Sequence, residues 1–431
     1  MKRIRRVQRL LDRHILKNVA VLMGGSAVAQ AVTVFSAPLI TRLFDPDAFG
    51  QYGLVLALSA PIATIACLRY ELAIVLPRRD EEGANLLTLS MTLAVVIPLL
   101  ITLSVALFGA AIARALGDEA IRPLLWWVPV IVALTGAFQS ASYWSTRRQR
   151  FGDLAMTTTG KSVATVGVQG VAGYSGAAVL GLILGHVVGL AFGVATLWSR
   201  ILLRDISSVR AGLRLDSIVA AARAHARFPA FSAPQALVNA LSRNAPLLVL
   251  GAFFGPGLVG YYLLAHRVLK MPLTLLGNAF RQALYPRAAE VARSHGLRRL
   301  VVRSTLGLCL AALPPCLVLL LTGPQLFAFV FGADWAPAGV YAQALSVWLM
   351  TGLVAAPSLV AVNVLGLQRM HALLETGSLV IRISALAIGG VLGDDVLAVR
   401  MFAIVGLVSN AAIVGIVMNH CHRSGTAGGS A

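Results

Sequence analysis

Residues 228–290 read FPAFSAPQALVNALSRNAPLLVLGAFFGPGLVGYYLLAHRVLKMPLTLLGNAFRQALYPRAAE. This stretch consists of two long apolar segments joined by a tight Gly-Pro turn, with arginine and lysine placed where a membrane span would meet hydrocarbon. Helices in lipid satisfy their backbone hydrogen bonds internally, so paired apolar segments of this length predict a transmembrane helical hairpin. Cations inside such a hairpin indicate a functional site.

The turn of this hairpin recurs about 210 residues earlier in the chain. Phe44-Asp45-Pro46, followed by Gly50 and Tyr52, corresponds to Phe254-Gly255-Pro256, followed by Gly260 and Tyr262. A repeat of this length in an apolar chain predicts two related helical bundles. Transporters built from such repeats hold their binding site between the repeats.

The whole chain has the composition of a membrane protein. Of its 431 residues, 58% are hydrophobic and 12% are charged, and the mean hydropathy is +0.81. The net charge of +19 comes mainly from basic residues between apolar segments, as the positive-inside rule predicts, so no nucleic-acid partner is expected. The four cysteines show no CxxC spacing, and neither they nor the histidines flanking Cys421 predict a metal site.

Apolar segments alternate with short polar loops along the chain and predict an all-α polytopic membrane protein of about 12 transmembrane helices in two six-helix halves. Placing both termini in the cytosol puts nearly every loop arginine inside and most loop carboxylates outside. The predicted spans are 18–44, 51–76, 84–113, 123–146, 152–174, 177–198, 228–254, 258–285, 302–321, 340–365, 370–391 and 396–419.

These spans divide the chain into five parts. A basic cytosolic amphipathic segment at 1–17 has the spacing of a helix on a lipid surface and no cleavage site of a secretory signal. The N-terminal lobe at 18–199 and the C-terminal lobe at 228–420 are joined by a basic cytosolic linker at 200–227, expected to form an interfacial helix. A Gly/Ser-rich flexible tail occupies 421–431.

Three stretches carry a family resemblance: APLITRLFDP at 37–46, RYELAIVLP at 69–77, and LSRNAP at 241–246 with FFGP at 253–256 and LYPRAA at 284–289. They resemble the oligosaccharide flippases of bacterial surface-polysaccharide synthesis (Wzx-type), in the superfamily that includes the multidrug and toxin extrusion (MATE) transporters. The resemblance implies a MATE-like fold and transport of a polyprenyl-diphosphate-linked oligosaccharide across the bacterial cytoplasmic (inner) membrane. It also implies a polysaccharide polymerase and a chain-length regulator as partners.

Five cations are predicted to lie near the middle of their spans. Each costs on the order of 3 kcal/mol if it faces lipid, so together they predict a shared cationic cavity for the substrate diphosphate. The planar guanidinium suits a phosphate pair particularly well. The alternative is that these cations pair with intramembrane acids or cap carbonyls. The five are Arg243, Arg267, Lys270, Arg382 and Lys161.

Two carboxylates, Glu71 and Glu375, lie inside spans. Arg69 and Glu71 are two residues apart, about 160° around a regular helix, so no direct pair is expected between them. Glu375 and Arg382 are seven apart and share one face. Arg69, Glu71 and Glu375 are candidates for gating or for coupling to H+ or Na+, and an ordinary ion pair between helices is the alternative.

Neutral polar residues inside the spans are candidates for binding sugar hydroxyls, although such groups equally often join helix to helix. These are Gln30, Asn239, Asn244 and Asn363. The six tryptophans, Trp144 and Trp348 among them, are expected to act mostly as interface anchors near span ends. No phosphate-cradling glycine loop or HExxH motif is present, so an enzyme is not predicted and no cofactor is expected.

The sequence therefore favours a flippase that works by alternating access. A multidrug or cation antiporter of the same superfamily is the alternative, but cationic substrates would favour exposed acids over mid-span cations. A membrane polysaccharide polymerase or ligase is the third candidate. It would be expected to carry a long catalytic loop, whereas the longest predicted outer loop, at 322–339, holds one charged residue.

Overall fold

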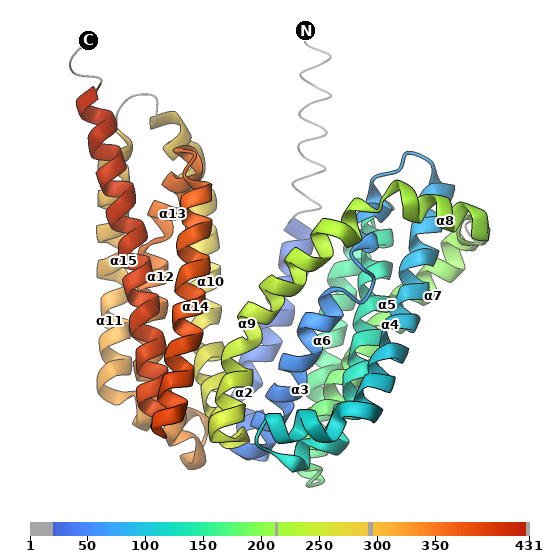
Figure 1. Cartoon of the computed structure of the whole chain (residues 1–431), viewed down its shortest axis with the longest axis horizontal. Coiled ribbons are helices and arrows are strands. Elements are labelled where there is room, and N and C mark those ends of the chain that lie inside the picture. The colour runs from blue at the N-terminus through green and yellow to red at the C-terminus, as the bar shows by residue number, and fades with distance from the viewer. Residues whose placement is uncertain (1–19, 212–213, 292–295, 428–431) are drawn as a thin grey trace. The chain divides into compact units, whose positions relative to one another are not determined.

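The computed structural model of the chain describes residues 20–211, 214–291 and 296–427. Within these ranges every regular element is a helix (Figure 1). The predicted amphipathic segment at 1–17 lies outside the described residues, and the tail at 421–431 is described only as far as residue 427.

The chain forms two compact units, Met1–Leu248 and Val249–Ala431. The boundary falls inside one helix, and the lobe limits expected from the sequence remain predictions. Unit 1 contains α2 (Ala37–Leu43), which ends a helical stretch beginning at Ala20, then α3 (Pro46–Thr64), η1 (Tyr70–Val75), α4 (Asp80–Ala115), η2 (Glu119–Trp126), α5 (Trp127–Arg147), α6 (Phe151–Tyr174), α7 (Ala178–Ala211), α8 (Leu215–Ala224), η3 (Phe228–Ser232) and most of α9 (Ala233–Phe254).

Unit 2 begins with the last residues of α9. Its long helices run alongside one another (Figure 1). The elements are α10 (Pro256–Val291), α11 (Leu297–Phe331), η5 (Ala333–Trp335), α12 (Ala336–Val354), α13 (Ala356–Val364), α14 (Gln368–Leu392) and α15 (Asp395–Ala427).

Among the described residues, nine helices are long and apolar enough to cross a membrane. Three further helices, α3, α6 and α10, lie where the sequence predicts spans but are less apolar. In α10 the reason is its cations, Arg267 and Lys270 among them. The predicted all-α polytopic fold is confirmed, while the orientation of the termini stays a prediction.

Two predicted spans are broken in the structure. The span predicted at 51–76 divides after α3, because Leu68 and Arg69 adopt left-handed backbone angles (φ 48° and 66°) before the chain continues as η1. The span predicted at 340–365 divides into α12 and α13, since Pro357 at the start of α13 has no amide hydrogen to continue the helix.

The outer loop predicted at 322–339 is wrong, because helix occupies most of it. α11 kinks at Thr322, whose backbone is not helical, and then continues to Phe331. Pro324 has no amide hydrogen for the carbonyl of Leu320, and the Gln343 side chain of α12 donates to that carbonyl instead, at 2.8 Å. The chain therefore stays helical on both sides of the kink, and the Gln343 side chain supplies the hydrogen bond that the Leu320 carbonyl would otherwise lack.

α11 and α12 approach each other at two glycines beside this kink. A Cβ atom added to Gly339 would lie 2.4 Å from the backbone carbon and oxygen of Gly323 and 2.5 Å from the Cα of Pro324. These are backbone atoms that no side-chain rotation can remove. The crossing therefore requires glycine.

We expect Gly339→Ala to lower the free energy of unfolding by about 1–3 kcal/mol, because the two helices must separate to admit the methyl group. Thermal unfolding of the purified protein in detergent measures the effect. Gly307→Ala is the matched control, since that glycine of α11 has open space around its Cβ position. Equal stability of the two variants would contradict a tight crossing.

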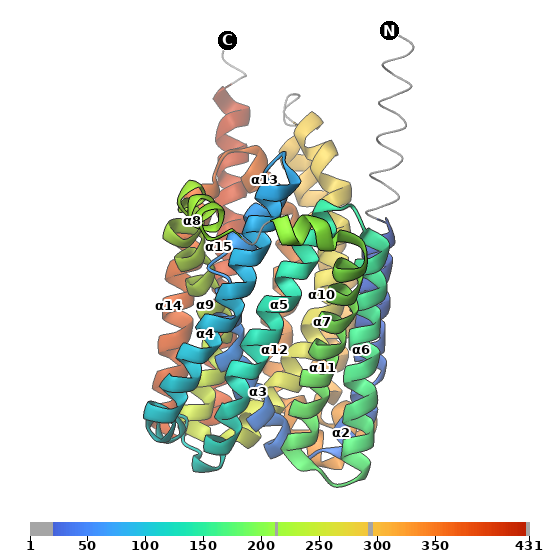
Figure 2. The ribbon, with the colours of Figure 1, turned by 90° about the vertical axis from the view of Figure 1, so that its right-hand side faces the viewer.

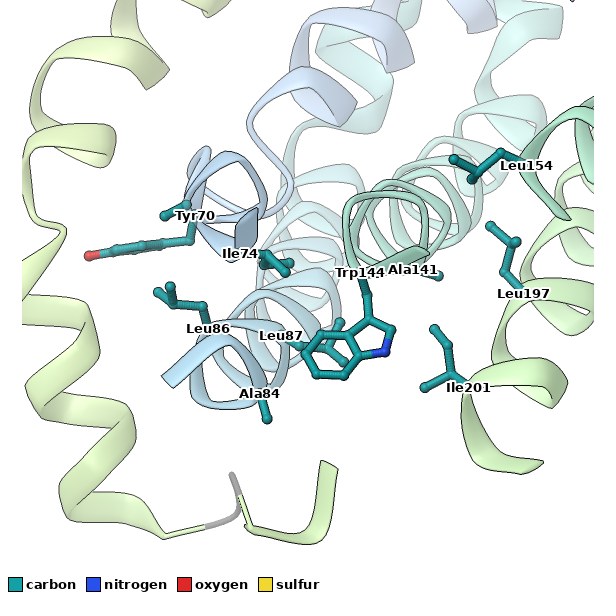
Figure 3. Close-up of a cluster of buried hydrophobic side chains, with 11 residues drawn as sticks. Tyr70, Ile74, Ala84, Leu86, Leu87, Ala141, Trp144, Leu154, Leu197 and Ile201 are labelled. Carbon is teal, nitrogen blue, oxygen red and sulfur yellow. The ribbon is translucent and has the colours of Figure 1, made fainter. Parts of the chain in front are cut away.

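A buried cluster in unit 1 packs η1 against α4, α5 and α7 (Figure 3). The Trp144 ring lies in the middle of the cluster, between Leu87 and Ile201, whereas the Tyr70 ring points outward from it (Figure 3). The Tyr70 hydroxyl donates to the carbonyl of Ala222 in α8 at 3.1 Å, and so holds α8 at the end of the unit where α4 begins (Figure 2). The predicted linker thus consists of the last turns of α7 followed by α8.

Trp144 is fully buried and is not an interface anchor, contrary to the expectation from the sequence. Its indole nitrogen donates to Asp205 of α7 at 3.0 Å. Arg150 binds the same carboxylate through both of its terminal nitrogens, at 2.7 and 2.9 Å. A nearly buried aspartate therefore joins the end of α5 to α7.

Candidate functional site

The candidate site in unit 2 centres on Arg382, the fifteenth of the 25 residues of α14. Its position lies about 15 Å along the helix axis from Leu392. The guanidinium carbon lies 5.3 Å from the ring centroid of Trp348 in α12 and 5.9 Å from that of Phe402 in α15. The side chain is 11% exposed. A mid-helix cation is thus held against two aromatic rings by cation–π contact.

Polar contacts from its own helix complete the surroundings of Arg382. Its Nε donates to the hydroxyl of Ser378 at 3.1 Å. One terminal nitrogen lies 3.5 Å from a carboxylate oxygen of Glu375, whose side chain is 45% exposed. The predicted shared face of these two residues is confirmed, and they form an ion pair within α14 rather than between helices. Because the contact is long and the acid is half exposed, the pair is weak.

Trp348 joins Arg382 to α10. His266 of α10 stacks on the Trp348 ring at 6.4 Å, and Tyr262 stacks on His266 at 5.7 Å. Phe402 of α15 meets the Trp348 ring edge-on, with the ring centroids 5.0 Å apart. A Cβ on Gly406 would come within 2.3 Å of the indole, so the ring needs glycine at that position. The tryptophan is therefore fixed by three helices.

This role of Trp348 differs from the prediction, because tryptophan is typical of the membrane interface. Its position is the available signal: it is the thirteenth of the 19 residues of α12, well inside the helix. An aromatic ring at that depth is too far from a headgroup region to serve as an anchor.

Arg267 is the residue after His266 on α10, Lys270 lies four residues after His266, and both cations are exposed. Within the described parts of the chain, no carboxylate lies within ion-pairing distance of Arg267. His266 stacks on the same Trp348 ring that contacts Arg382. Arg267 is the next residue and points about 100° away from His266 around the helix. A site shared by Arg382, Arg267 and Lys270 stays a prediction.

The other two predicted cations belong to unit 1. Lys161 of α6 is half-buried, with its ammonium 4.8 Å from the ring centroid of Phe138 in α5. Arg243 of α9 is exposed, and the described residues place no carboxylate beside it. The single cavity shared by all five cations stays a prediction, because it requires both units.

The candidate sugar-binding residues are scattered over several helices. Gln30, Asn239 and Asn363 are exposed. The side-chain amide of Asn244 donates a hydrogen bond to the carbonyl of Ala240, one turn earlier in the same helix, at 2.8 Å. Their role in binding sugar stays a prediction.

Arg69 and Glu71 form a direct ion pair at 3.5 Å, and the expectation that they point apart is wrong. That expectation assumed a regular helix, whereas Arg69 is left-handed and η1 starts only at Tyr70. The Glu71 side chain is 1% exposed, and neither carboxylate oxygen accepts a hydrogen bond from the described part of the chain. A buried carboxylate at a break in a helix is a candidate site for coupling or gating.

Several solved structures share this fold. One is a multidrug resistance MATE family transporter of the MOP superfamily in an inward-facing conformation, with a TM-score of 0.64 and 14% identity over 92% of this chain and 99% of that one. Another is the lipid II flippase MurJ in an inward closed conformation, with a TM-score of 0.68 and 10% identity over 92% and 87%. A mutant of the Vibrio cholerae MATE transporter VcmN matches with a TM-score of 0.52 and 13% identity, over 96% of this chain and 98% of that one.

These similar structures are transporters and a flippase rather than enzymes, and at 10–14% identity they show that this chain shares their fold. Together with its long apolar helices, the fold makes the chain a multi-pass membrane protein. A search of curated proteins found no match to the chain. Residues 39–339, more than half of the chain, match the family described as polysaccharide biosynthesis protein. The chain belongs to the polysaccharide biosynthesis protein family.

Proposed function

We propose that this protein is a flippase that moves a polyprenyl-diphosphate-linked oligosaccharide repeat unit from the cytosolic to the periplasmic leaflet of the bacterial inner membrane. The family supports a role in polysaccharide synthesis, and the fold supports transport. The observation that carries the proposal is Arg382, a cation held among aromatic rings in the middle of a transmembrane helix. The product destined for the surface would be an O-antigen, a capsule or an exopolysaccharide.

The substrate explains why a cation is needed at this depth. Its polyprenyl tail is apolar and stays in lipid, whereas its diphosphate is anionic and cannot cross hydrocarbon unassisted. The Arg382 fork binds two phosphate oxygens at once, with Arg267 and Lys270 supplying further positive charge from α10. Trp348 and Phe402 orient the guanidinium without neutralising it.

Release of the substrate requires that this binding be reversible. Glu375 already contacts Arg382 at 3.5 Å, so its carboxylate competes with the diphosphate for the same guanidinium. Alternating access of the two lobes would then expose the head group to the periplasm. Glu71 and Glu375 are the carboxylates through which an H+ or Na+ gradient would drive the return step.

A multidrug antiporter is the second candidate, because proteins of that activity share the fold. A cationic drug would need exposed carboxylates at mid-depth in unit 2. Glu375 is the acid beside Arg382, and it is half exposed and only weakly paired. Arg267 and Lys270 add positive charge on α10, so cations outnumber this one acid and the arrangement favours an anionic head group over a cationic drug.

The proposal is tested by replacing the two exposed mid-helix arginines, Arg243 and Arg267, with alanine in one variant. Each loss removes charge-assisted hydrogen bonds, so we expect at least a tenfold fall in translocation, with repeat units accumulating on the cytosolic leaflet. The measurement is the fraction of lipid-linked units accessible to an impermeant periplasmic reagent, normalised to protein in the membrane.

Arg122→Ala is the matched control, since this exposed arginine lies in η2, at the beginning of the span Glu119–Arg147 rather than in its middle. It should transport as the unaltered protein does. Unchanged periplasmic exposure of repeat units in the double variant, at equal protein level, would overturn the proposed role of these cations.

A further inference from the structure

A groove with a volume of about 410 Å³ lies between α11, α12 and α15 of unit 2. Two of these helices contribute one stripe of residues each. On α12 the stripe is Val340, Gln343, Ala344 and Val347, and on α15 it is Arg400, Ala403, Ile404 and Leu407. Spacings of three, four and seven place each stripe on a single helix face.

The dimensions of the groove suit an alkyl chain. Seven residues separate Arg400 from Leu407, so the apolar stripe continues for about 10 Å beyond the cation. Leu320 of α11 adds a further apolar side chain to the lining. Ala344 and Ala403 leave space between the walls, and the Gln343 amide already donates to the Leu320 carbonyl. From Arg400 toward Leu407, the groove is therefore lined by apolar side chains.

Arg400 is the charged residue of the lining, and it is exposed. The two acids nearest to it in sequence are engaged elsewhere: Asp395 accepts from the Tyr341 hydroxyl at 2.6 Å, and Asp394 caps the amide of Leu397 at 2.8 Å. Over the residues that the structure describes, no carboxylate pairs with Arg400. Its position about 8 Å from the start of α15 lets the long side chain reach the headgroup region.

The groove is separate from the site around Arg382. On α12, Val347 lines the groove and the next residue, Trp348, contacts Arg382. On α15, Ala403 lines the groove and the preceding residue, Phe402, contacts Arg382. Consecutive residues of a helix point about 100° apart. The groove therefore lies on a different side of α12 and α15 from the Arg382 cluster.

We propose that this groove binds an anionic phospholipid of the surrounding membrane, with the phosphate on Arg400 and an acyl chain between α12 and α15. A single cation matches the single charge of a phosphodiester rather than the two charges of a diphosphate. The apolar walls below it match an acyl chain, and a lone arginine at headgroup depth attracts anionic lipid. The site is independent of the proposed transport function.

The test is native mass spectrometry of the full-length protein, titrated with phosphatidylglycerol. We expect Arg400→Gln to weaken binding of the first phosphatidylglycerol about tenfold, because the charge-assisted bonds to the phosphate are lost. Ala344→Phe should weaken it as well, since the ring fills the groove and leaves the arginine in place. Arg122→Gln, an exposed arginine outside this groove, should bind as the unaltered protein does.

Thermal unfolding of each variant establishes that the fold is retained before binding is compared. Phosphatidylglycerol binding by Arg400→Gln equal to that of the unaltered protein would overturn the proposal, and so would an equal loss in Arg122→Gln. Displacement of phosphatidylglycerol from the site by equimolar polyprenyl diphosphate would assign the groove to the transported lipid instead.

Discussion

Arg382→Ala is expected to reduce translocation of the lipid-linked repeat unit by roughly a hundredfold, because the variant loses two charge-assisted hydrogen bonds to the diphosphate at the middle of the membrane. The leaflet-accessibility measurement described for Arg243 and Arg267 detects this loss directly. Arg382→Lys keeps the charge but lacks the planar fork, so it should retain an intermediate rate. That ranking distinguishes phosphate recognition from a general need for positive charge.

Arg369→Ala is the matched control on the same helix. Arg369 is the second residue of α14 and is exposed, far from the rings that hold Arg382. It should leave translocation within about twofold of the unaltered protein. If Arg382→Ala, at normal abundance in the membrane, translocates at the rate of Arg369→Ala, the diphosphate does not meet Arg382.

The second large effect concerns stability. Asp205→Ala is expected to lower the free energy of unfolding by about 3–5 kcal/mol, because it leaves Arg150 and the buried indole nitrogen of Trp144 without their acceptor. The Asp205 side chain is 6% exposed, so water cannot fully replace the carboxylate. Chemical or thermal unfolding in detergent, followed by tryptophan fluorescence, measures this change.

Asp216→Ala supplies the comparison, since Asp216 in the first turn of α8 is exposed. Its loss should change the free energy of unfolding by less than about 0.5 kcal/mol. The double variant Asp205→Ala/Arg150→Ala should recover part of the stability by removing the unpaired cation. Equal stabilities of the two single aspartate variants would show that the buried carboxylate contributes nothing to the link between α5 and α7.

Sequence patterns located most helices because lipid imposes a local rule. A backbone segment in hydrocarbon must satisfy its own hydrogen bonds, so each apolar run becomes a helix wherever its neighbours lie. The Gly-Pro turn at residues 255–256 and the charged turn at 394–395 could therefore be read directly. Arg382 was found in the same way, since a lone cation in an apolar run stands out without any knowledge of its contacts.

Other features depended on residues far apart in the chain. Trp348 covers Arg382 from another helix, and Trp144 bonds to Asp205 across 61 positions. The left-handed break at Leu68 and Arg69 carries no glycine or proline that would announce it. Left-handed backbone angles at such residues cost free energy, and they persist only where contacts with the surrounding structure compensate that cost.

The sequence by itself determined that this chain is a bundle of membrane helices with cations at mid-span, because hydrophobicity and loop charge act residue by residue. Only the tertiary structure decided which rings surround Arg382, where the helices break and which faces of α12 and α15 line the groove beside Arg400. These outcomes depend on side-chain packing between helices, and the free energy of packing is a property of the contact rather than of either segment alone.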